Sequence, residues 1–145
     1  MNKVQIWSRL AKRAEALASN ALVELAGARR RLQELVASEA RLIELRTDYV
    51  ARLHKVESEP HAMSQNMACR RYISHIESLL QKIVEAQLVV RENIAQAREK
   101  QRAAEADRVK MQHLAEAEAA RVLRLLKARE QNQMDQLAIS RFNLR

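Results

Sequence analysis

The sequence predicts an all-α protein in which two long helices form an antiparallel coiled-coil hairpin, the second helix being longer than the first. Three observations support this fold class. The 145 residues include one Gly and one Pro, too few to punctuate a strand-rich fold or to form a Gly-rich nucleotide loop. Of the 48% apolar residues, 24 are Ala, which leaves little bulk for a globular core. The charged fraction of 30% is typical of long helices.

One break divides the chain into two helical stretches. Pro60 disfavours helical geometry at the residue before it, so residues 57–64 are predicted to form a loop. The first helix is expected over 4–56 and the second over 65–141, with Ser64 as the N-cap of the second. We expect the whole chain, 1–145, to form a single hairpin domain.

Apolar residues recur in both stretches at alternating steps of three and four, which indicates a coiled-coil seam. A short loop makes folding back inexpensive in entropy, so an intramolecular hairpin is favoured over a parallel dimer. The two seams fit an antiparallel register in which paired residue numbers sum to about 122. This register sets Val90 against Leu32 and Ile94 against Ala28.

The same register contains two mismatches and one thin region. Ile83 faces Glu39 and Ile76 faces Arg46. Either the charged heads extend outward along their stems, or the register differs by a few residues. Further along, the seam consists mostly of alanines, and small side chains bury little area, so the pairing there is expected to be loose.

The sequence contains no recognisable catalytic, cofactor or metal site. No two of the four His residues have the i, i+4 spacing that places two imidazoles on one helix face, and Cys69 has no second thiol to complete a zinc set. The longest bulky apolar run, Leu88 to Val90, is far shorter than a membrane span. We therefore expect a protein that is not an enzyme and needs no cofactor.

Basic and apolar residues coincide at the end of the hairpin where both termini lie. Residues 1–31 carry seven Lys or Arg and two Glu, and residues 121–145 carry six basic and two acidic residues. In the predicted register, residues 119–145 have no partner within the chain, yet they are too apolar for a free tail. This end is therefore predicted to dock a partner, through Arg9, Lys12, Arg13, Arg121, Arg124, Leu125, Lys127 and Arg129.

A second candidate surface lies near the loop. Apolar residues beside the seam widen the stripe beyond what a two-stranded coil needs. In the predicted register Tyr72 lies by Val50 and Leu79 by Ile43. Two interpretations stay open: a broader self-packing face, or a groove for a partner helix whose anchors are Tyr72, Ile76, Leu79 and Ile83.

Two further functions compete with docking to a specific partner. A generic coiled-coil scaffold or adaptor would need only the hairpin. A nucleic-acid binder would use the basic end, but the chain has no continuous basic region leading into a zipper and no aromatic residues interleaved with basic ones. We therefore expect no nucleic-acid partner and no small-molecule substrate.

Three segments carry a resemblance to a known family. They are LIELRTDYV at 42–50, RYISHIESL at 71–79, and QNQMDQLA at 131–138 followed by Arg141 and Phe142. In these segments, and in length and layout, the chain resembles the bacterial flagellar export protein FliJ family. It departs from the family at Pro60, where Gly is common, and at Gln136, where Glu follows the Asp. These departures leave open whether it serves a flagellum or a virulence injectisome.

The resemblance implies a central stalk and chaperone escort of a type III export apparatus. Such a stalk enters and regulates a hexameric export ATPase, contacts an export-gate membrane protein, and handles export chaperones. It implies that the basic end docks the ATPase and that the Tyr72 stripe touches the gate. The protein would be monomeric when free, cytoplasmic, and peripheral to the inner membrane at the flagellar base.

Overall fold

The computed structural model describes residues 2–59 and 63–144, and over these residues it is almost entirely helical. Helix α1 spans Lys3–Glu57 and helix α2 spans Met63–Asn143. The described residues contain no strand. The predicted all-α hairpin with a longer second helix is therefore confirmed. Pro60, at the centre of the predicted loop, lies outside the described residues.

Polar groups satisfy the backbone at the helix ends. The N–H of Gln5 donates to the side-chain oxygen of Asn2 over 2.9 Å, which makes Asn2 the N-cap of α1. At the other end, the hydroxyl of Ser58 donates to the carbonyl of Lys55 over 2.6 Å. These bonds use groups that a helix terminus leaves unpaired. Ser64, predicted as the cap of the second helix, instead lies inside the first turn of α2.

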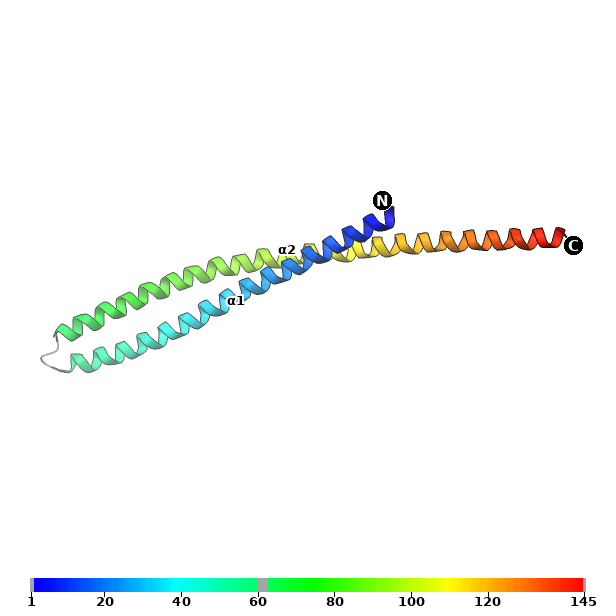
Figure 1. Cartoon of the computed structure of the whole chain (residues 1–145). Coiled ribbons are helices and arrows are strands. Elements are labelled where there is room, and N and C mark those ends of the chain that lie inside the picture. The colour runs from blue at the N-terminus through cyan, green and yellow to red at the C-terminus, as the bar shows by residue number, and fades with distance from the viewer. Residues whose placement is uncertain (1, 60–62, 145) are drawn as a thin grey trace. The chain divides into compact units, whose positions relative to one another are not determined.

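Each helix contributes to two compact units. Unit 2 comprises Leu22–Lys100, and unit 1 comprises Met1–Ala21 together with Gln101–Arg145. In unit 2 the end of α1 and the start of α2 lie side by side as antiparallel helices (Figure 1). In unit 1 the C-terminal part of α2 extends well past the N-terminus of α1, as the same figure shows.

The core of unit 2 follows the predicted seam. Leu25, Leu35, Val90 and Ile94 form one buried cluster, with Ala28 and other partly buried residues packed against it. Nearer the loop, the rings of Tyr49 and Tyr72 stack with centroids 4.5 Å apart. The numbers of these two tyrosines sum to 121, within one residue of the predicted register.

The two predicted mismatches are accommodated within unit 2. Gln87 is 5% exposed and its amide donates a hydrogen bond to the Glu39 carboxylate. The Glu39 carboxylate therefore contacts Gln87, which lies one helical turn beyond Ile83 on α2. Arg46 is half-buried, whereas Ile76, predicted to face it, is only 1% exposed and is the most deeply buried side chain. No shift of register is needed, because long side chains reach past the seam.

The core of unit 1 is thin. Its buried residues are Ala14, Ala18 and Ala21, and the residues of α2 at the same seam, such as Ala104 and Met111, are only partly buried. Burial of three alanines removes little apolar area from water. This part of the hairpin therefore has little hydrophobic stabilisation.

Candidate interaction surfaces

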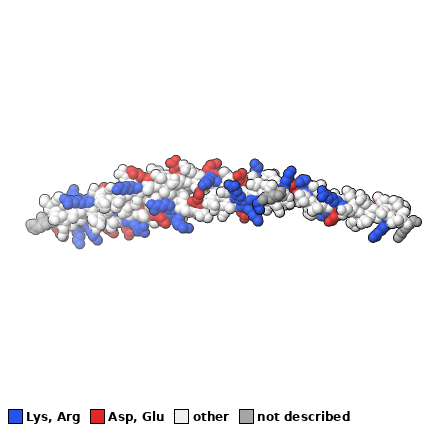
Figure 2. Space-filling view, turned by 45° about the horizontal axis from the view of Figure 1, so that its top comes forward, with Lys and Arg blue, Asp and Glu red and all other residues white. Residues whose placement is uncertain are grey.

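The eight docking residues predicted at the basic end all lie in unit 1, whereas Arg29, Arg30 and Arg31, which were counted with the basic residues of 1–31, lie in unit 2. Unit 1 holds 13 basic and 7 acidic side chains, against 13 and 11 in unit 2. In the view of Figure 2, positive and negative side chains alternate over much of the surface, and the last turns of α2 are mostly uncharged. Arg9, Lys12 and Arg13, the three predicted docking residues of α1, are all exposed.

The basic residues of α2 differ in how far they are already engaged. Arg121 donates two hydrogen bonds to the Glu118 carboxylate, over 3.1 and 2.7 Å. That contact lowers the pKa of Glu118 and raises the pKa of Arg121. Across residues 2–59 and 63–144, by contrast, no ion pair or hydrogen bond engages Arg124, Lys127 or Arg129. These three cations are available to a partner.

The C-terminal stretch of α2 is exposed on all sides from Leu123 onward. Leu125 is 48% exposed, and Phe142 is 79% exposed. The other large apolar side chains exposed in this stretch are Leu123, Leu126, Met134, Leu137, Ile139 and Leu144. Free solvated helices seldom carry so many apolar side chains, so this stretch of unit 1 is suited to enclosure by another protein.

The four residues of the predicted partner stripe have different environments. Tyr72 is 49% exposed and stacks on Tyr49, which in turn lies under the Arg52 guanidinium at 5.0 Å. Leu79 is partly exposed and Ile83 partly buried against the core cluster. Ile76 is buried, so it belongs to the core of the hairpin and is not available as an anchor. Tyr72 and Leu79 are the members that can contact a partner.

Two ion pairs identify the two sides of the seam in unit 2. Lys100 contacts Glu24 at 3.0 Å, and Glu24 immediately precedes the buried Leu25. Arg70 contacts Glu57 at 3.0 Å, and Glu57 immediately follows the seam residue Val56. Leu25 and Val56 belong to the two different apolar rows of the seam. In a helix, a residue that precedes the first row and a residue that follows the second row lie on opposite sides of the apolar stripe. The two ion pairs therefore mark opposite flanks.

Steps of seven residues then assign the exposed apolar side chains to one flank or the other. Tyr72 and Leu79 share the side of Lys100, together with Leu45, which is on the side of Glu24; we call these three residues the tyrosine flank. The side of Glu57 and Arg70 carries Val36, Ile43, Val50 and Val84, and Leu88 lies beside them because it is one helical turn after Val84; we call these five residues the valine flank. The expectations that Tyr72 lies by Val50 and that Leu79 lies by Ile43 are thus both wrong. The residues of each pair share a level along the hairpin but lie on opposite flanks.

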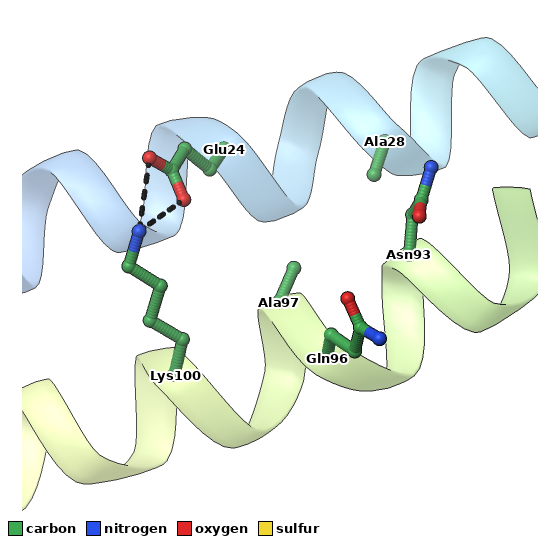
Figure 3. Close-up of a pocket in the computed structure, with 6 residues that line it drawn as sticks. All are labelled: Glu24, Ala28, Asn93, Gln96, Ala97 and Lys100. Atoms are coloured by element: carbon green, nitrogen blue, oxygen red, sulfur yellow. Dashed lines mark hydrogen bonds and ion pairs between the residues drawn. The ribbon is translucent and has the colours of Figure 1, made fainter.

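Beyond Leu79, the flank of Tyr72 continues into a shallow groove of unit 2. Ala28 and Ala97 leave space between the helices, bordered by Asn93, Gln96 and the Glu24–Lys100 ion pair (Figure 3). Small side chains from both helices meet at this level, as the register predicts. The groove is open and lacks a cluster of reactive groups.

Sequence reasoning did not select Val84 and Leu88, which are 47% and 60% exposed. Val89, on the opposite flank, is also 60% exposed. The heptad positions could have predicted this exposure, because only Val90 of the Leu88–Val90 run falls on a seam position. Within the described residues, no group of three or more His, Cys, Asp or Glu could hold a metal ion, and no helix has an apolar stretch long enough to span a bilayer.

The fold and these surfaces define a class of protein, an antiparallel helical hairpin whose distinctive features are contact surfaces. The family model described as Flagellar FliJ protein matches residues 7–145, nearly the whole chain. The chain therefore belongs to the flagellar FliJ family and is a flagellar export-related protein. The members of this family are non-catalytic components of export. Searches of curated proteins and of solved structures returned no significant match.

Proposed function

We propose that the protein is the non-enzymatic central stalk of the flagellar export apparatus, and that it inserts into and regulates a hexameric export ATPase. In the same proposal it contacts the membrane export gate and escorts export chaperones, and it works at the cytoplasmic face of the inner membrane. The family membership and the resemblance of three segments support this role.

The observation that carries the proposal is the exposed stretch of α2 beyond Leu123. A ring of subunits surrounds its central element, so an inserted helix must present apolar and charged groups on every side. This stretch does so: at 100° per residue, and measured from Leu125, the directions of Leu126, Leu137, Phe142 and Ile139 are about 100°, 120°, 260° and 320° around the helix. The unengaged cations Arg124, Lys127 and Arg129 would attract an acidic ring opening and raise the association rate.

An ATPase assay with the purified export ATPase tests this part of the proposal. Addition of the full chain should stimulate hydrolysis, because a stalk favours one conformation of the surrounding subunits. The variant Arg124→Glu, Lys127→Glu should need about tenfold or more protein for half-maximal stimulation, since charge reversal places like charges in contact. The matched control is Arg71→Glu, Lys82→Glu, which should behave like the unaltered chain; both cations are exposed in unit 2, and no ion pair or hydrogen bond with another described residue engages them.

Two results would count against the stalk. One is the absence of any ATPase response at saturating protein, which would favour a simple scaffold. The other is an equal loss of stimulation in the control variant. A gel shift at about 150 mM salt addresses nucleic acid, because non-specific phosphate binding weakens steeply with salt; persistent binding there would favour the nucleic-acid alternative.

Contact with the export gate is assigned to the tyrosine flank. Tyr72 and Leu79 combine an exposed aromatic ring with a neighbouring aliphatic side chain, a combination common at protein contacts. The variant Tyr72→Ala, Leu79→Ala should keep its helicity and lose binding to the purified gate protein. The variant Ile43→Ala, Val50→Ala on the valine flank is the control and should bind normally. Loss of binding in both variants, or in neither, would refute the assignment.

A further inference from the structure

A second apolar surface in unit 2 is separate from the surfaces assigned above. The valine flank presents Val36, Ile43 and Val50 on α1 and Val84 and Leu88 on α2, and each side chain is at least 36% exposed. Val36 and Val50 are 14 residues apart, which corresponds to about 21 Å along α1. Neither helix needs these residues for the hairpin, because they lie outside the two seam rows.

The charges beside this surface are symmetric about one residue. Glu77 precedes Val84 by seven residues and Arg91 follows it by seven, so all three face the same side of α2. Glu77 and Arg91 are both exposed. In the part of the chain that the structure describes, no ion pair or hydrogen bond engages either of them. An acid and a base thus stand unpaired at equal distances from Val84.

We propose that the valine flank binds a second copy of this chain, in an antiparallel pairing whose two-fold axis passes beside Val84. A two-fold axis there places Val84 against Val84 of the second copy and brings Arg91 over Glu77 of the second copy, twice. On α1, the axis falls between Val36 and Ile43, so each of these residues meets the other across the pair. The charges of Glu77 and Arg91 are therefore self-complementary in this pairing.

The extent of the surface predicts a weak dimer. Five partly exposed side chains in each copy cover less than the roughly 800 Å² per partner of a stable interface. We expect a dissociation constant above about 10 μM, so the chain is monomeric when dilute and pairs at high concentration. Because Tyr72 and Leu79 lie on the opposite flank, the pairing leaves them free.

Sedimentation velocity of the full chain, from about 5 μM to about 500 μM, tests the proposal. The mass should rise with concentration, and Val84→Glu should abolish the rise by bringing two carboxylates together at the axis. The matched control is Val89→Glu, on the opposite flank, where the valine is 60% exposed against 47% for Val84; this variant should still associate. Circular dichroism of each variant verifies that the helices are retained.

A charge exchange separates a two-fold contact from other association. Glu77→Arg alone sets Arg against Arg at each of the two contacts, and Arg91→Glu alone sets Glu against Glu at each of them, so either should weaken the dimer about tenfold or more. The double variant restores opposite charges at both contacts and should recover the original dissociation constant. In a Cys69→Ser background, Val84→Cys should form a disulfide-linked dimer on oxidation, whereas Val89→Cys should not.

The proposal is overturned if the chain stays monomeric over the whole range of concentration. It is also overturned if Val89→Glu abolishes association and Val84→Glu does not, or if the double exchange fails to recover it. None of these outcomes bears on stimulation of the ATPase, so the dimer and the stalk can fail independently.

Discussion

Replacement of Ile76 by Ala tests whether this residue belongs to the core of the hairpin or serves as an anchor for a partner. The side chain is 1% exposed, so truncation removes three fully buried carbon atoms. At about 0.8 kcal/mol per carbon, the transfer contribution is roughly 2.4 kcal/mol. The cavity left behind adds to this, but a two-helix core is open to water at its sides and can partly collapse. We expect a loss of about 2.5–3.5 kcal/mol in the free energy of unfolding of unit 2.

The assay is urea unfolding followed by circular dichroism at 222 nm. Ile139→Ala is the matched control, because the same side chain there is 60% exposed. Both variants gain the same small increase in helix propensity from Ala, which cancels in the comparison. The free energy of unfolding of the control should stay within about 0.5 kcal/mol of that of the original chain. If both variants unfold at the same urea concentration, or if Ile76→Ala keeps full stability and loses only a partner, the assignment of Ile76 to the core is wrong.

Three further predictions concern single features of the hairpin. Replacement of both Glu39 and Gln87 by Leu should stabilise unit 2 by about 1–3 kcal/mol in the same urea assay, because an apolar pair there needs no hydrogen bond. Gly27→Ala should increase the free energy of unfolding by about 1 kcal/mol and so raise the thermal midpoint, since a Cβ at that position meets no atom within 4 Å. Hydrogen bonds from Arg108 and Arg121 lower the pKa of Glu105 and Glu118 below 4.5, so the stability they contribute is present above that pH and is lost as pH falls through the lowered pKa. Thermal midpoints between pH 6 and pH 3 should show this fall, and a variant with Gln at both positions should show a smaller one.

The sequence was sufficient for the fold because a two-stranded coil is governed by periodicity. Helices predicted over 4–56 and 65–141 are observed over Lys3–Glu57 and Met63–Asn143. The small differences arise at the ends, where single caps decide. The register also followed from the pattern, since Leu25, Leu35, Val90 and Ile94 pack together only when the two seams are matched as predicted.

Two features depended on geometry that a register does not contain. Glu39 was paired by level with Ile83, but a carboxylate on a flexible stem reaches the next turn and accepts a hydrogen bond from Gln87. Tyr72 was placed by Val50 because only the level along the seam was considered. The side of the seam decides which residues share a surface, and the two interhelical ion pairs supply that information.

The separation into two flanks has a consequence for function. At the levels where one row of α1 carries Val36, Ile43 and Val50, the row on the side of Tyr72 carries Ser38, Leu45 and Arg52. A mixed row on one flank and an aliphatic row on the other indicate different partners, because an aliphatic row suits a similar row and a mixed row suits a more polar surface. If the flanks act separately, Val84→Glu should leave gate binding unchanged, and the double Ala variant of the tyrosine flank should leave self-association unchanged. A mutual effect of the two substitutions would mean that one partner spans both sides of the hairpin.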